Sequence, residues 1–134
     1  MNKNEIGKVI LRGILGLTFF IHGLSKFQGG ISNTVGYFDS LGIPGILAYA
    51  VAAIELIGGI ALVLGIGTKV VGLLFALIML GAIITAKLPL GFLGNGQMAG
   101  YELDLALLAM SIYFVLADKS ELSLDNKLFK STAN

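Results

Sequence analysis

Four apolar segments constrain the fold of this chain more than any other feature of its sequence. They are residues 6–27, 46–66, 70–88 and 100–117. Each has about 18 to 22 residues, which at about 1.5 Å per helical residue matches a hydrocarbon core about 30 Å thick. Lipid offers no partner to unpaired backbone groups, and the apolar residues run on without alternating, so the segments should be helices. The sequence therefore predicts an all-α protein, an integral membrane four-helix bundle.

The composition supports a single transmembrane domain over residues 1–134. Hydrophobic residues make up 56% of the chain and charged residues 13%, against roughly 25% charged residues in soluble domains. Gly29-Gly30 and Pro44-Gly45 bracket the first connection, whose apolar side chains predict a short interfacial helix between spans one and two. Residues 118–134 are polar and are expected to form a cytoplasmic tail.

The basic residues predict the orientation of the spans in the plasma membrane. Six lysines fall on one side of the four spans (Lys3, Lys8, Lys69, Lys119, Lys127 and Lys130). Only Lys26 and Lys87 fall near the other side. Because cytoplasmic loops are enriched in basic residues, we expect a multi-pass protein with both termini cytoplasmic. Glycine and alanine recur within the spans, which suits close helix packing and leaves a homo-oligomer open.

Several classes of function are excluded by composition. A net charge of +1 without a dense basic run argues against nucleic acid as a partner. The absence of cysteine excludes thiol chemistry and iron–sulfur clusters, and with a single histidine we expect no metal site. The glycine-rich stretch 91–100 lacks the Lys-Ser/Thr ending of a phosphate-binding loop. With no covalent cofactor or nucleotide motif, any cofactor, such as a bound quinone, must be held non-covalently or lie on a partner.

Ionisable residues inside the spans are the candidate functional residues. Each costs about 2.5–3.5 kcal/mol at the centre of a membrane helix, so it is expected to be paired, hydrated or used. Arg12, His22 and Lys26 lie in the first span at spacings that place them on one helix face. That face should point into the bundle.

Three acidic residues could neutralise these bases. Glu55 lies near the middle of the second span, whereas Glu102 and Asp104 lie near the outer end of the fourth. Estimated depths predict two sets of contacts: Arg12 with Glu55, and His22 or Lys26 with Glu102 or Asp104.

Each of these residues also has a purely structural interpretation. Arg12 and Glu55 could only lock two helices together, and His22 could be a satisfied polar residue. Lys26 and Lys87 could extend their ammonium groups to the outer interface. Carboxylates such as Glu102 and Asp104 are favoured near any helix N-terminus.

Aromatic residues gather toward the outer side of the spans, among them Phe19, Tyr37 and Phe38. They could belong to the aromatic belt that marks a membrane interface. Alternatively, they could form a flat wall for an aromatic ligand.

An ordered set of residues carries a family resemblance. It consists of Arg12, His22-Gly23-x-x-Lys26, Glu55 followed by Gly58-Gly59, the turn Gly65-x-Gly67-Thr68, Glu102, and the tail sequence Ser123-Leu124-Asp125. On four apolar spans this set resembles the DoxX family of small four-span membrane proteins. The resemblance implies a plasma-membrane protein of a family often labelled as oxidoreductases. It is closest to the branch linked to tolerance of catechols and quinones.

Two functional hypotheses follow. The first is a membrane oxidoreductase, or a subunit of one, that acts on quinones or catechols and takes electrons from a redox partner protein or bound cofactor. Its assigned residues are His22, Lys26 and Glu102 as catalytic groups, Arg12 and Glu55 as the polar core, and Phe19, Tyr37, Phe38 and Asp104 as substrate-binding groups. The second is a non-enzymatic membrane scaffold, or a binding or export factor for small phenols.

Overall fold

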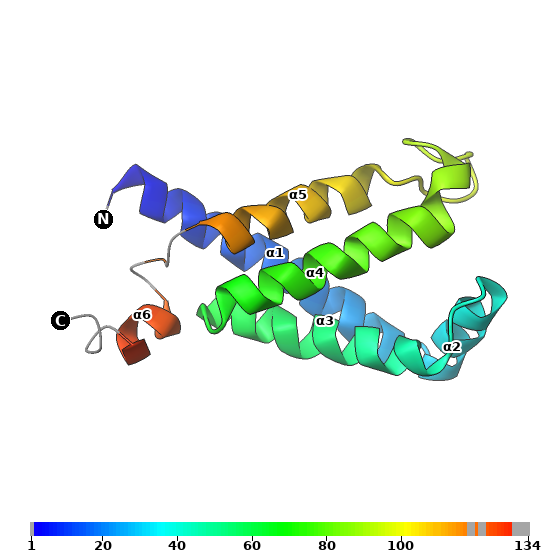
Figure 1. Cartoon of the computed structure of the whole chain (residues 1–134), viewed down its shortest axis with the longest axis horizontal. Helices are drawn as coiled ribbons and strands as arrows, with labels where there is room; N and C mark the ends of the chain where they lie inside the picture. The colour runs from blue at the N-terminus through cyan, green and yellow to red at the C-terminus, as the bar shows by residue number, and fades with distance from the viewer. Residues whose placement is uncertain (1, 118–119, 121–122, 130–134) are drawn as a thin grey trace.

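The computed structural model describes residues 2–117, 120 and 123–129, and every regular element among them is helical. The elements are α1 (Lys3–Gln28), α2 (Ile31–Ser40), α3 (Ile46–Leu64), α4 (Thr68–Ala82), the π-helical turn η1 (Ile83–Lys87), the 3-10 turn η2 (Leu88–Leu90), α5 (Glu102–Leu116) and α6 (Leu124–Phe129). Figure 1 shows the four long helices running side by side, with α2 at one end and α6 at the other. The all-α membrane bundle and its short helix between the first two spans are confirmed.

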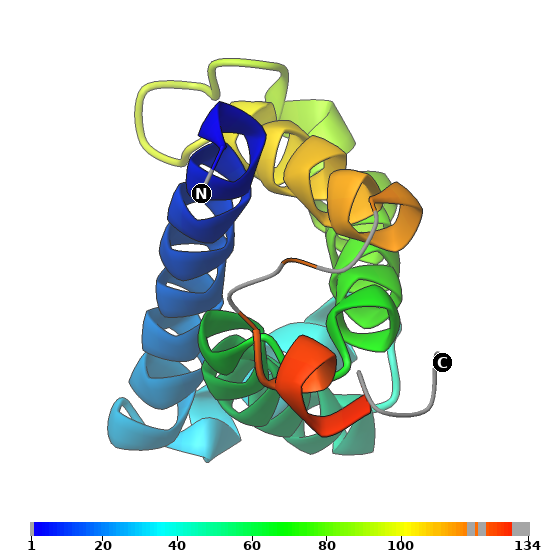
Figure 2. The same cartoon turned by 90° about the vertical axis from the view of Figure 1, so that its left-hand side faces the viewer.

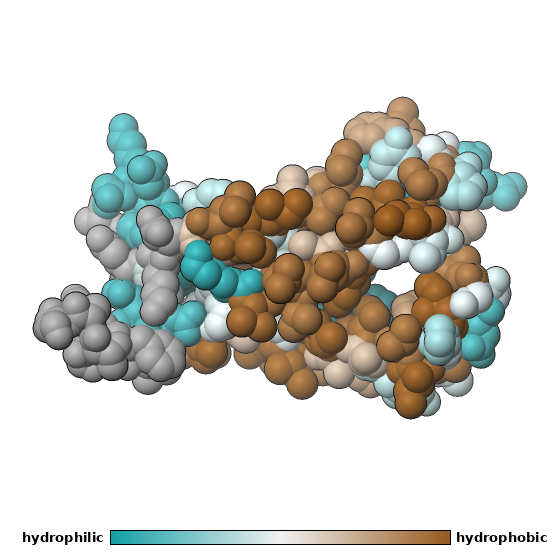
Figure 3. Space-filling model, in the orientation of Figure 1, coloured by the Kyte–Doolittle hydropathy of each residue, from teal (hydrophilic) through white to brown (hydrophobic). Residues whose placement is uncertain are grey.

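Three stretches of the described chain are long and apolar enough to cross a membrane. They are Lys3–Gln28, Ile46–Leu64 and Thr68–Leu90, the last of which joins α4 to the two short turns after it. The fourth predicted span also forms a helix, α5, but it has only 15 residues. On the face shown in Figure 3, apolar residues cover the middle of the surface and polar residues gather at both ends, as expected for a protein immersed in a bilayer.

Local sequence signals explain where the helices begin and end. The side chain of Asn2 caps α1 by accepting a hydrogen bond from the backbone N–H of Glu5 at 2.8 Å. Gly65 and Gly67 adopt left-handed conformations, with φ of 79° and 58°, and form the tight turn predicted between α3 and α4. Such φ values are strained for other residues, so these glycines fix the antiparallel hairpin.

The four long helices form two closely packed pairs, α1 with α3 and α4 with α5, whereas contacts between the pairs are sparser. Figure 2 shows the two pairs on opposite sides of the bundle axis. A Cβ atom on Gly16 would lie 2.7 Å from the carbonyl oxygen of Gly59, and one on Gly23 would lie 2.6 Å from the backbone nitrogen of Leu56. Small residues thus bring the α1 and α3 backbones together, as the sequence predicts.

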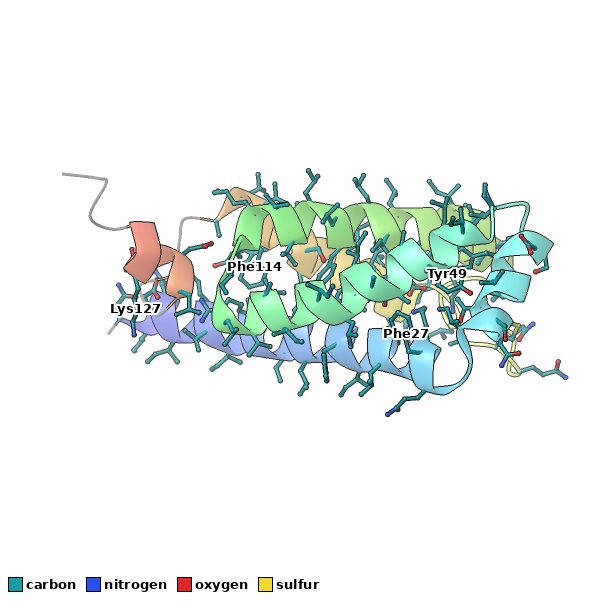
Figure 4. The ribbon with its side chains drawn as sticks, turned by 90° about the horizontal axis from the view of Figure 1, so that it is seen from below. Phe27, Tyr49, Phe114 and Lys127 are labelled. Atoms are coloured by element: carbon teal, nitrogen blue, oxygen red, sulfur yellow. The ribbon has the colours of Figure 1, made fainter. Side chains whose placement is uncertain are left out.

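Apolar side chains join the two pairs at the centre of the bundle. Phe19 of α1 stacks on Phe75 of α4 with ring centroids 3.8 Å apart and an interplanar angle of 18°. Leu15, Leu62 and Phe114 are buried beside the stack, and Figure 4 shows Phe114 pointing between the helices. This core fills the middle of the bundle and separates two polar regions, one at the α2 end and one at the α6 end.

Candidate functional site

A cavity of about 700 Å³ opens at the α2 end of the bundle. Side chains from α1, α2, α3, the α4–η1 helix and α5 line it. In Figure 3 the surface is hollowed at this end, between the half that carries α4 and α5 and the half that carries α2 and α3. Its volume falls in the range of roughly 300–1,000 Å³ typical of small-molecule sites.

An ion pair between α1 and α3 lies in the wall of this cavity. The Nζ atom of Lys26 is 2.6 Å from Oε1 of Glu55, close enough for a charge-assisted hydrogen bond. The Glu55 side chain is 3% exposed and the Lys26 side chain 25% exposed, so the carboxylate is buried and the ammonium group reaches the cavity. An ammonium group carries three N–H donors, so Lys26 can bind a second acceptor while it holds Glu55.

His22 lies one helical turn before Lys26 and lines the same cavity. Its imidazole contributes to the electrostatic environment of Glu55. No described residue hydrogen-bonds to the His22 ring, so its two nitrogens remain available to a ligand. The predicted shared face therefore brings His22 and Lys26 to one site.

The helix α2 supplies one wall with aromatic and polar character. Tyr37 and Phe38 line the cavity from this helix, together with Asn33 and Thr34. Phe19 lines it from α1, at the edge of the central core. The structure thus brings the three aromatic candidates together around one cavity. Asn33 and Thr34 were not among the predicted residues, although their spacing from Tyr37 and Phe38 on a short helix could have indicated a shared face.

A second ion pair faces the cavity from the other helix pair. The Nζ atom of Lys87, at the end of η1, lies 4.0 Å from Oδ2 of Asp104 on α5. Both residues line the cavity. Asp104 was a predicted substrate-binding residue, whereas Lys87 was expected only to reach the interface. Lys87 reaches the cavity because the π-helical turn changes the face of the helix on which it lies. Hydropathy gives no sign of such a turn.

The predicted pairing of Arg12 with Glu55 is wrong. Glu55 is held by Lys26, and Arg12 lies at the opposite end of the bundle, where its Nη1 would be 3.1 Å from a Cβ atom on Gly65. Because α1 and α3 run antiparallel, Arg12 near the start of α1 meets the end of α3, beyond Glu55. The acids whose charges act on Arg12 are Glu5 and Asp125.

The predicted partner of Lys26 on the fourth span is likewise replaced by Glu55. Glu102 is exposed at the first position of α5 and does not line the cavity. Asp104, two residues later, does line it and pairs with Lys87. The carboxylates beside the cavity are therefore Glu55 and Asp104. The catalytic role assigned to Glu102 remains a prediction.

A separate polar cluster closes the α6 end of the bundle. Asp125 accepts hydrogen bonds from the backbone N–H groups of Gly67 at 3.0 Å and Thr68 at 3.3 Å, and so caps α4. The hydroxyl of Ser120 donates to Oε2 of Glu5 at 2.7 Å. Part of the predicted tail is thus folded against the bundle, while residues 118–119, 121–122 and 130–134 lie outside the described residues.

The cavity at the α2 end has the groups needed to bind and protonate a small oxygenated ring. It offers ammonium and imidazole donors, two carboxylates, and aromatic side chains that can cover the face of a ring. The cluster at the α6 end, by contrast, uses its charges to hold the tail against the helices. The candidate site is therefore the cavity between the two helix pairs.

Three known proteins are similar to this chain over most of its length. "Putative oxidoreductase CatD" of Bacillus subtilis (strain 168) is 49% identical over 135 residues, covering 100% of this chain and 96% of the relative. An uncharacterized membrane protein of Mycobacterium tuberculosis is 30% identical, covering 91% of this chain and 81% of the relative. An uncharacterized protein of Haemophilus influenzae is 30% identical, covering 90% and 89% respectively. No solved structure matches the chain. Residues 7–88 match the family model described as DoxX, and the chain therefore belongs to the DoxX family.

Proposed function

We propose that this protein is the membrane subunit of an oxidoreductase that binds a quinone or catechol in the cavity at the α2 end. The Lys26–Glu55 pair in the cavity wall carries the proposal, because it sets a donor and a buried carboxylate side by side at membrane depth. Such groups are costly in a bilayer and are usually retained for use. The name of the relative from Bacillus subtilis supports an oxidoreductase.

In the proposed reaction a quinone gains two electrons and two protons, so that both C=O groups become C–OH groups. Lys26 and His22 donate hydrogen bonds to a ring oxygen, and Glu55 exchanges a proton with it. Glu102, exposed at the start of the helix that carries Asp104, is assigned to proton entry from water. The chain has no cysteine to relay electrons, so the two electrons come from a partner reductase or from a cofactor held non-covalently. Removing reactive quinones would give the cell tolerance to catechol and quinone stress.

The proposal includes an orientation in the plasma membrane. The start of α1 and the helix α6 lie at the same end of the bundle (Figure 1), which suits four crossings. We assign this end to the cytoplasm because Lys3, Lys8, Lys69 and Lys127 belong to it. The cavity then opens toward the outer leaflet, where lipid-soluble quinones can enter.

Quinone reduction by membrane vesicles tests the proposal. Vesicles are prepared from native host cells in which the protein has been deleted and then restored as wild type or variant. NADH-driven reduction of 2-decyl-1,4-benzoquinone is followed by absorbance. We expect restoration by wild type, and a rate about a hundredfold lower with Glu55→Gln because a positioned proton-transfer group is lost. His22→Ala and Lys26→Met should also lower the rate.

Asp39→Asn is the matched control, because it removes an exposed carboxylate on α2 that does not line the cavity. It should support the wild-type rate. Immunoblots confirm equal insertion of every variant. Equal rates with Glu55→Gln and wild type would refute the assigned chemistry.

The second candidate is a non-enzymatic factor that binds or exports small phenols, with membrane scaffolding as its simplest form. The observation in its favour is that most of the cavity lining is apolar, while the chain has no thiol that could change oxidation state. The same vesicles distinguish it from the first. Movement of catechol across the membrane without quinone reduction would favour export, and neither activity would favour a scaffold.

A further inference from the structure

We propose that Lys87 and Asp104 form a second ligand-binding pole of the cavity, and that its ligand is a ring with oxygens at opposite, 1,4-positions and an apolar substituent. This inference rests on the function proposed above and narrows its substrate class from quinones and catechols in general to para-quinones. Four observations about the cavity carry it.

The two ion pairs belong to opposite walls. Lys26 and Glu55 lie on α1 and α3, one closely packed helix pair, and Lys87 and Asp104 lie on the α4–η1 helix and α5, the other pair. Figure 1 shows these two pairs diverging at the α2 end, and the cavity lies between them. Oxygens at adjacent ring positions point to the same side of a ring, whereas oxygens at 1,4-positions point to opposite sides, as the two walls of the cavity do.

The backbone is adapted to bring Lys87 to the cavity. The α4 positions that line it include Leu74, Ile78 and Ala82, a spacing of about one α-helical turn. The π-helical turn Ile83–Lys87 has i→i+5 hydrogen bonds. Lys87 therefore lies one turn after Ala82, on the helix face that lines the cavity. Single π-helical turns within α-helices are frequent at functional sites.

The Lys87–Asp104 pair has more unused hydrogen-bonding capacity for a ligand than the Lys26–Glu55 pair. Its 4.0 Å separation is too long for a hydrogen bond, whereas Lys26 and Glu55 are 2.6 Å apart. Within the described part of the chain, Oδ2 of Asp104 accepts no hydrogen bond, and Lys87 makes only a long one of 3.4 Å to the carbonyl of Ala99. A hydroquinone hydroxyl could accept from Lys87 and donate to Asp104.

The size of the cavity indicates the substituent. A cavity of about 150 Å³ is enough to bind benzene. The cavity between the helix pairs measures about 700 Å³, and most of its remaining lining, including Leu77, Leu103 and Leu107, is apolar. An unsubstituted ring would leave most of this volume unfilled, so the ligand should carry an apolar chain.

Two isomeric probes test the second pole directly. 2-Decyl-1,4-hydroquinone and 4-decylcatechol contain the same atoms and differ in the placement of the ring oxygens. Their binding to the purified full-length protein in detergent is measured by anaerobic titration calorimetry. We expect the 1,4-isomer to bind about tenfold more tightly, the effect of one additional hydrogen bond to a charged group.

Binding measurements on variants test whether the second pole causes the preference for the 1,4-isomer. Lys87→Met should weaken binding of the 1,4-isomer and so remove its preference over the catechol. The nearly isosteric Asp104→Asn should reduce the same preference. Lys26→Met should weaken both isomers. Lys3→Met, which removes an exposed lysine at the other end of the bundle, is the control and should change neither. Melting curves confirm that each variant is folded.

The outcomes separate this inference from the proposed function. If both isomers bind equally and Lys26→Met weakens both, the second pole is overturned while the function of the cavity stands. If Lys87→Met weakens both isomers equally, Lys87 gives no preference and the inference is also overturned. If neither isomer binds, the proposed function fails together with the inference.

Discussion

The Nζ atom of Lys26 lies 2.6 Å from Oε1 of Glu55, so the last turn of α1 is joined to the middle of α3 by a charged contact. The carboxylate is almost completely buried, and the ammonium group faces the cavity. The buried carboxylate could not remain charged at this depth without the lysine, because an isolated charge in a low-dielectric medium is strongly disfavoured. The pair therefore has both a structural effect and a chemical use, and substitutions can separate the two.

Lys26→Met should destabilise the protein by about 3 kcal/mol, because it leaves Glu55 buried without its cation. The double variant with Glu55→Gln should recover much of this loss, since it removes both charges. Chemical unfolding in detergent measures the two values. Lys87→Met is the comparison, and its longer, more exposed pair with Asp104 should contribute less than about 1 kcal/mol. Equal losses for both lysine variants would contradict the difference between the pairs.

Gly59→Ala should destabilise the bundle by about 1–3 kcal/mol through overpacking. A Cβ atom at this position would lie 2.6 Å from the carbonyl oxygen of Gly16 and from the backbone nitrogen of Phe20. Backbone atoms cannot move aside without separating α1 from α3. Gly13→Ala on α1 is the matched control, because a Cβ there has nothing within 4 Å. Its expected effect is neutral or a gain of up to about 1 kcal/mol from helix propensity, seen as an unchanged or higher melting temperature.

Asp125→Ala should loosen the start of α4 and release the attached tail segment. The carboxylate of Asp125 accepts from the N–H groups of Gly67 and Thr68, and loss of such a cap costs about 1 kcal/mol. Hydrogen exchange at these two amides should accelerate, which mass spectrometry of the α3–α4 turn detects. Lys127→Ala, an exposed site on the same short helix (Figure 4), should leave the exchange unchanged. Acceleration in both variants would mean that the helix as a whole, not the cap, protects the turn.

The proposed orientation predicts which single-cysteine variants react from each side. The chain has no cysteine of its own, so each introduced thiol reports alone. In intact cells, an impermeant maleimide should label Gln97→Cys in the loop between η2 and α5. Lys3→Cys and Lys127→Cys should react only after the membrane is opened. Labelling of Lys3→Cys in intact cells would reverse the assignment.

The helices and their approximate limits could be predicted from the sequence because hydropathy is a local property. The predicted second span, 46–66, becomes α3, Ile46–Leu64, and the turn after it follows from Gly65 and Gly67 alone. The shared face of His22 and Lys26 likewise depends only on helical periodicity. These features require no knowledge of how one helix lies against another.

The ion pairs could not be predicted in the same way. Estimates of depth place Arg12 beside Glu55. The actual partner depends on which side chains of α1 and α3 lie at the same height along the bundle. That alignment is set by the antiparallel contact of the two helices, which glycines fix. The role of Asp125 depends on the tail folding back to the α3–α4 turn, a contact across more than fifty residues. Lys87 reaches the cavity through a π-helical turn, which hydropathy does not reveal.

The short length of α5 has a consequence for the surrounding lipid. Its 15 residues span about 22 Å, against about 30 Å for an average hydrocarbon core, while its partner stretch Thr68–Leu90 is a full membrane length. Lipid next to α5 must therefore thin locally, or the connection before Glu102 must sink toward it. Thinning of the lipid and sinking of the connection both bring water and headgroups closer to Asp104 on the α5 side of the bundle. The thickness of the host bilayer, set by acyl-chain length, would then tune how readily protons and ligands reach the cavity.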